Sequence, residues 1–270
     1  GEYYVSDDNW VDAHVICGKQ IVRPLQLGCL DIATGKMVHW GMMPRMMRQD
    51  GTHAGLTERY MRMFVAGLLA NVGINTSRGT TLVVENGTAA IRAHMEQVLL
   101  DLFDGAVKVH RSGMEGKTQA LLRGYEGRQG GNPRGKAHLE SVWNLTANIW
   151  SSCLPAPSGH DRTEPEWLAG LMKEQKALLK KQGYLEIRDP DRAATPRHLM
   201  PTFEQLTTDI AWRVYDAFND RTDHALEGWE RMGLVVPMVR LSTDGDWITL
   251  TDSIPEADRH TLLNMAARDP

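Results

Sequence analysis

The stretch TLVVENGT, from Thr81 to Thr88, indicates the fold class of this chain. Its β-branched and apolar residues, Thr81 to Val84, are followed by Glu85 and then by the turn-forming pair Asn86-Gly87. From residue 89 to residue 102, apolar side chains recur at helical spacing. The stretch therefore predicts a buried strand that ends in an acid and leads into a helix, as in α/β proteins.

Glu85 would then lie at the carboxyl end of a strand, where open α/β sheets place their functional sites. An ordinary acidic turn residue is the alternative interpretation. Which of the two holds depends on the other residues that the fold brings to this edge.

The segments around this unit predict the rest of a sheet. Residues 3–16, 21–31 and 37–43 read as strands joined by short turns, which is typical of an antiparallel meander. Pro24 fits the start or the edge of a strand. A helix is expected over residues 56–72 and a further strand over 106–109. The order predicts a mixed five-stranded sheet with helices on its faces.

Residues 111–136 are rich in glycine and basic side chains, which predicts a long connection that is either functional or simply solvated. The basic residues are Lys117, Arg123, Arg128, Arg134 and Lys136. A helix over residues 137–152 follows, with Glu140 in its first turn. Further helices are expected at 164–182 and 201–219, an irregular stretch at 185–201, a hairpin near Asp244-Gly245, and a last helix at 255–268.

We therefore expect a core over residues 1–155 and a helical extension over 156–270 that packs on it as one structural unit. The net charge of −4 counts against a simple basic DNA-binding module. The cysteines, Cys17, Cys29 and Cys153, form no Cys-x-x-Cys pair, so neither a zinc site nor a disulfide framework is indicated, and a reducing cytoplasm is favoured.

No run is long and apolar enough to predict a membrane span. The chain starts in strand-like sequence without an initiator methionine, which favours a domain excised from a longer protein.

Three acids fall where the expected elements expose them. Asp8 interrupts the first strand, Glu85 ends the fourth, and Glu140 opens a helix. Clustered carboxylates hold divalent ions in phosphoryl transfer, with substrate phosphates supplying further ligands. Asp7 is an alternative to Asp8, and the two side chains point to opposite faces if the segment is extended.

These acids stand in a series of motifs that resembles the DDE transposase and retroviral integrase superfamily, and most closely the catalytic core of phage Mu-type transposases. The likeness extends over about residues 3–230. The motifs are DNW at 8–10, IVRP at 21–24, DIATGKMVHW at 31–40, ENGT at 85–88, NPRGKAHLE at 132–140 and YDAFNDRTDH at 215–224.

The resemblance implies an RNase H-like fold and metal-dependent DNA nicking followed by strand transfer. Asp8, which aligns with the family's first acid, would hold two Mg²⁺ or Mn²⁺ ions together with Glu85 and Glu140. The basic residues of 111–136 would hold DNA phosphates. The implied partners are transposon or prophage ends, target DNA, and further copies of the chain assembled on DNA, with no membrane.

One residue departs from the family pattern, in which the second acid is normally Asp. Glu85 is longer by one carbon–carbon bond, ~1.5 Å, which is large against metal–oxygen tolerances. Three hypotheses follow from this: a strand-transfer enzyme, a metal-dependent nuclease of the same fold, and a catalytically silent core that assembles on DNA or with partners.

Overall fold

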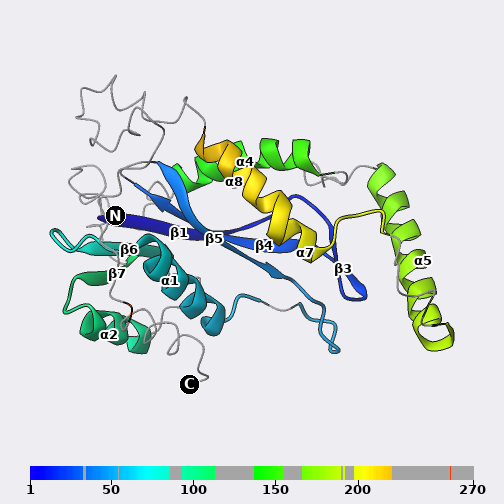
Figure 1. Ribbon diagram of the computed structural model, residues 1–270, viewed down its shortest axis with the longest axis horizontal. Helices are drawn as coiled ribbons and strands as arrows, with labels where there is room; N and C mark the ends of the chain where they lie inside the picture. The colour runs from blue at the N-terminus through cyan, green and yellow to red at the C-terminus, as the bar shows by residue number, and fades with distance from the viewer. Residues whose placement is uncertain are drawn as a thin grey trace.

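The computed structural model describes residues 1–32, 35–53, 55–85, 93–112, 137–154, 166–189, 191, 198–220 and 256. Five strands form a mixed sheet in the order β5-β4-β1-β6-β7 (Figure 1). β1 pairs antiparallel with β4, which pairs antiparallel with β5, whereas β6 and β7 run parallel to β1. The bounds are β1 Tyr3–Trp10, β4 Pro24–Asp31, β5 Lys36–Pro44, β6 Thr80–Glu85 and β7 Val107–Ser112.

This arrangement confirms the predicted mixed five-stranded sheet, and Pro24 does start its strand. Two strand predictions are wrong in detail. Residues 3–16 and 21–31 were each expected as one strand. Instead, the chain forms a separate hairpin, β2 Val15–Cys17 and β3 Gln20–Val22, after β1 and before β4 in the sequence. Gly18, at φ +56°, forms its two-residue turn, a conformation that glycine adopts without strain.

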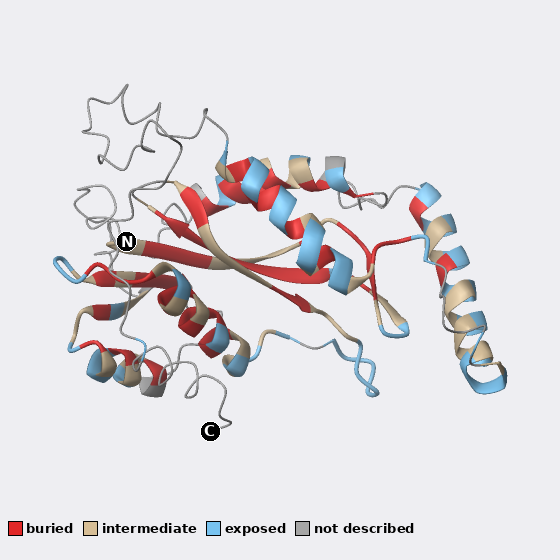
Figure 2. Ribbon diagram, in the orientation of Figure 1, coloured by how far each residue is buried: buried red, intermediate tan, exposed pale blue. Residues whose placement is uncertain are grey.

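Helices cover both faces of the sheet. Figure 1 shows α1 (Glu58–Val72) and α2 (Ala93–Leu102) on one side, and α4 (Ala137–Cys153) and α8 (Ala211–Asn219) on the other. One hydrophobic cluster joins the sheet to α1 and α2, and a second joins it to α4 and α8. Figure 2 shows the buried residues concentrated in these layers. We call the two surfaces of the sheet the α1 face and the α4 face.

A further long helix lies at one end of the molecule, at the right in Figure 1. α5 (Glu166–Arg188) stands beside the β2–β3 hairpin, and Ile16 joins Leu168 and Met200 in a small cluster there (Figure 1). α5 extends six residues beyond its predicted end, so residues 185–188 are helical rather than irregular. Gly183 is tolerated within the helix. The helix ends at Arg188, two residues before Pro190 in the sequence.

A capped helical segment follows α5. α7 (Phe203–Gln205), the π-helical turn η2 (Leu206–Ile210) and α8 run on without a break, as the prediction of a helix at 201–219 requires. Thr202 and Gln205 form a capping box at its start. The expected hairpin near residue 244 and the helix at 255–268 lie outside the described residues, apart from Glu256. No helix in the described part of the chain combines the length and hydropathy needed to cross a bilayer.

A hydrogen bond ties α8 to the sheet. The Tyr215 hydroxyl donates to Gln26 Oε1 at 2.5 Å, and both side chains are buried. Burial raises the pKa of Tyr215 far above its ordinary value, so the hydroxyl keeps its proton and remains a donor. The amide oxygen of Gln26 thereby has a hydrogen-bond partner within an apolar layer.

Gly28 sets how closely α4 approaches the sheet. A Cβ at this position of β4 would overlap Trp143 Cη2 of α4 and would come within 2.8 Å of Met37 Sδ. Because glycine has no side chain, the indole of Trp143 packs directly on the backbone of β4. Any larger residue would require the side chains of Trp143 and Met37 to shift.

We expect Gly28→Ala to destabilise the protein by about 1–3 kcal/mol, since the added methyl overpacks the interface under Trp143. Gly41→Ala on the neighbouring strand is the matched control, because its Cβ would make only an ordinary contact of 3.4 Å with Phe64. The midpoint of urea unfolding of each variant measures the effect. Equal midpoints for the two variants would contradict the packing argument.

On the other face, His39 of β5 is enclosed by α1. Its ring lies 4.8 Å from the ring of Phe64, and Gly67 of α1 leaves the room that its imidazole occupies. Burial lowers the pKa of His39 to about 4, although a hydrogen bond with the backbone of Phe64 acts in the opposite direction. The imidazole is therefore neutral in the folded protein at neutral pH.

This burial predicts a loss of stability in mild acid. The pKa of His39 is lower in the folded protein than in the unfolded chain, so its contribution is present above about pH 6.5 and is lost as pH falls toward 4. Between pH 7.5 and pH 5 the unfolding free energy should fall by up to ~2 kcal/mol more in the parent than in His39→Gln. His53→Asn, at an exposed position, should retain the parent's pH dependence in the same denaturation series.

Candidate functional site

The first candidate acids lie on the middle strand of the sheet. In the pairing of β1 with β4, Asp7 stands opposite Gly28, and Asp8 stands opposite Leu27. Both aspartates are half-buried. Successive side chains of a strand point to opposite faces, so only one of the two shares a face with any given helix.

The register decides which face each aspartate takes. Leu27, the partner of Asp8, belongs to the hydrophobic cluster beneath α1 and α2. Gly28, the partner of Asp7, lies directly under Trp143 of α4. Directly opposed residues of an antiparallel pair share a face, so Asp7 lies on the α4 face and Asp8 on the α1 face.

Glu140 belongs to the same side of the molecule as Asp7. It lies in the first turn of α4, three residues and so about one turn before Trp143. The side chains of Leu139, Val142 and Trp143 are buried, and Glu140 is exposed at the border of this apolar stripe. Helix α4 also contacts β1. The structure thus brings Asp7 and the first turn of α4 to one face of the sheet.

The backbone of Glu85 ends β6 beside β1. The parallel register pairs Tyr3 with Thr81 and Val5 with Val83. Continued by two residues, it brings position 85 level with Asp7. On its other side, Glu85 pairs with Ser112 of β7. The expected place of this acid at the carboxyl end of a strand is confirmed, while its side chain lies outside what the structure describes.

The three predicted acids therefore do not all share one face. Asp8, the expected first ligand, is separated from Glu140 by the sheet, and the register favours the alternative, Asp7. Among the side chains that the structure describes, no three His, Cys, Asp or Glu residues gather closely enough to hold a metal ion. Asp7 and Glu140 supply two carboxylates on the α4 face, a donor type that suits Mg²⁺ completed by substrate phosphates.

The predicted DNA-contacting residues cannot be placed. Lys117, Arg123, Arg128, Arg134 and Lys136 all lie within residues 113–136, outside the described part of the chain, as does the Asn86-Gly87 turn. Only the start of the expected connection is described, and Arg111 and Ser112 there belong to β7.

Sequence reasoning missed a second group of basic side chains, which lines a cavity between the β2–β3 hairpin and α5. Its members come from segments far apart in the chain, so no local motif contains them. The one sequence signal is the pair Lys176 and Lys180, which lie one turn apart on the same side of a lysine-rich helix.

Protein-family models and curated proteins were both compared with this sequence, and neither comparison finds a match.

Proposed function

We propose that this chain is the catalytic core of a DNA strand-transfer enzyme with an RNase H-like fold. The observation that carries the proposal is the position of Asp7. It lies on the middle strand, on the face covered by α4, whose first turn contains Glu140, and level with the end of β6 at Glu85. The mixed sheet of five strands is compatible with this fold.

The proposed ligands are Asp7, Glu85 and Glu140, which would hold Mg²⁺ or Mn²⁺ against DNA phosphates. Divalent ions in such sites stabilise the charge that develops on the attacking and leaving oxygens of phosphoryl transfer. Asp7 is held by a strand that is paired on both sides, with β4 and β6, and Glu140 is held by a helix packed on Gly28. Both residues are therefore carried by rigid elements, which a preorganised metal site requires.

Residue 85 determines how well this site performs. A glutamate in place of the expected aspartate moves the carboxylate outward by ~1.5 Å, more than metal–ligand distances tolerate without adjustment. This departure favours a second candidate function, a silent core that binds DNA and partners without reacting. A nuclease that cuts without joining uses the same acids and differs only in its product.

Substitution of Asp7 and Glu140 tests the proposed site. Labelled duplexes with exposed 3′-hydroxyl ends are incubated with a supercoiled plasmid in Mn²⁺, and nicking and joining are measured separately. Asp7→Asn and Glu140→Gln should each lower both rates by more than ~100-fold, since even groups that only support metal ligands are worth about 10–100-fold.

Asp8→Asn is the matched control, because it makes the same chemical change one residue away on the α1 face. It should leave both rates within a few-fold of the parent, with all variants folded by circular dichroism. Full loss in Asp8→Asn together with normal rates in Asp7→Asn would overturn the assignment of the face.

Glu85→Asp distinguishes the three functions in the same assay. We expect the substitution to raise the joining rate, because the shorter side chain restores the usual reach to the metal. Joined product from the parent identifies a strand-transfer enzyme, and nicked plasmid alone identifies a nuclease. Product from the Asp variant only identifies a silent core, and no product from either protein contradicts the metal site.

A further inference from the structure

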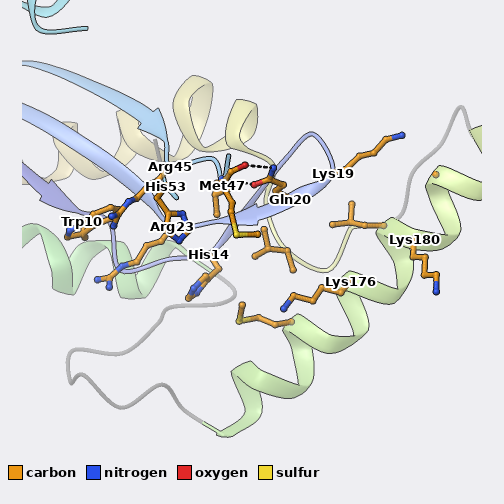
Figure 3. A pocket seen from close by; sticks show the side chains of 15 residues that line it. Trp10, His14, Lys19, Gln20, Arg23, Arg45, Met47, His53, Lys176 and Lys180 are labelled. Carbon is orange, nitrogen blue, oxygen red and sulfur yellow. Dashed lines mark hydrogen bonds between the residues drawn. The ribbon is translucent and has the colours of Figure 1, made fainter. Parts of the chain in front are cut away.

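A cavity of about 790 Å³ opens between the β2–β3 hairpin, the segment after β5, and α5. Figure 3 shows its side chains arriving from these three parts of the chain. Its size lies within the range of pockets that bind small organic ligands, and it exceeds what a single phosphate fills. None of the acids of the proposed catalytic site lines this cavity.

The lining of this cavity is strongly basic. Two of the lining residues are histidines and none is an acid, although the chain as a whole carries a net charge of −4. The fully charged side chains are Lys19, Arg23, Arg45, Lys176 and Lys180. We refer to them as the basic cavity residues.

Part of this charge is neutralised at the rim. Lys19 Nζ lies 2.9 Å from Glu186 Oε2, and Arg23 pairs with Asp12. For Arg45, Lys176 and Lys180, no carboxylate of the described residues lies within ion-pair distance. Among the residues that the structure describes, the cavity therefore keeps an excess of positive charge, which attracts anions and is screened by salt.

The wall that carries Arg45 is built rather than a chance gathering of surface residues. The guanidinium carbon of Arg45 lies 4.4 Å from the centre of the Trp10 ring, and that of Arg23 lies 6.0 Å away. Gln20 of β3 donates to the carbonyl of Met47 and accepts from its backbone amide, at 3.2 and 2.9 Å (Figure 3). These contacts fix the hairpin against the segment that follows β5.

Apolar side chains complete the cavity opposite these cations. Ile21, Met172 and Leu179 line it, and all three belong to the cluster that joins the hairpin to α5. Figure 3 shows Lys176 extending from α5 into the cavity, whereas the amino groups of Lys180 and Lys19 point outward at its edge. Proteins that bind unpaired nucleic acid combine a cationic groove for the phosphates with a surface, most often aromatic, on which the bases pack.

We propose that this cavity binds an unpaired segment of a DNA strand. Arg45 and Lys176 contact its phosphates within the cavity, Lys180 contacts a phosphate at its edge, and a base packs against Ile21, Met172 and Leu179. The bases of a duplex are stacked and paired inside it, so only an unpaired base could pack against this apolar wall. The choice of DNA as the anion rests on the proposed function, whereas the binding itself needs neither metal nor the carboxylates of the α4 face.

The test measures binding of a fluorescent single-stranded oligonucleotide of about ten nucleotides, a length within known site sizes, by anisotropy in EDTA. Lys176→Glu/Lys180→Glu should weaken binding at least tenfold. Its matched control is Lys173→Glu/Lys181→Glu, which makes the same change of charge on α5 at exposed residues outside the cavity. The control should weaken binding by less than threefold.

Salt dependence gives a second readout. Loss of two phosphate contacts should reduce the slope of log K against log salt by roughly 1.4, and the control pair should leave the slope unchanged. Equal effects of the two pairs would show that only the overall charge matters and would overturn the proposal. Tighter binding of a duplex of the same length, with the same dependence on Lys176 and Lys180, would also overturn it.

The nicking and joining assay keeps the two proposals separate. Weakened binding in Lys176→Glu/Lys180→Glu, with no metal-dependent chemistry in the parent, supports the cavity and refutes the catalytic function. Unchanged binding, with chemistry that Asp7→Asn abolishes, refutes the cavity alone.

Discussion

The direct packing of Trp143 on the backbone of β4 at Gly28 is the constraint on which the arrangement of the α4 face depends. An indole against a glycine lets a helix approach a sheet more closely than two ordinary side chains allow. Glu140 precedes Trp143 by about one turn, and Asp7 stands opposite Gly28. The contact between Trp143 and Gly28 therefore sets the distance between α4 and the sheet. It also sets where Glu140 of the helix stands relative to Asp7 of the strand.

The two faces of the sheet give adjacent residues different surroundings. Asp7 and Asp8 differ by one position in the sequence, yet one lies on the α4 face and the other on the α1 face. On the α1 face, the environment is apolar enough to keep His39 neutral, with its pKa lowered to about 4. Because side chains alternate along β1, one aspartate faces each of the two helical layers.

Local sequence patterns predicted most of the sheet and its helices. β6 is a short β-branched and apolar run, and α1 and α4 carry apolar residues at helical spacing, so the type and place of all three followed from local sequence. The separate β2–β3 hairpin was not predicted, because its two strands have three residues each and read as continuations of their neighbours. The alternation of side chains along a strand predicted that Asp7 and Asp8 lie on opposite faces of the sheet. It could not predict which of these faces α4 covers. The basic cavity was missed for a related reason: residues 10–23, 45–53 and 172–183 meet only in the folded chain.

Helix α8 completes the hydrophobic layer on the α4 face. Val214, Tyr215 and Phe218 are buried in the same cluster as Leu30 of β4 and Trp150 of α4, and the Tyr215 hydroxyl satisfies Gln26. All three proposed acids lie within the first 140 residues, but a fragment that stops after α4 would expose this apolar layer to water and lose the hydrogen bond between Tyr215 and Gln26. The smallest piece of the chain able to fold around those acids therefore extends to about Asn219, so the folding unit is much longer than the segment that holds the acids.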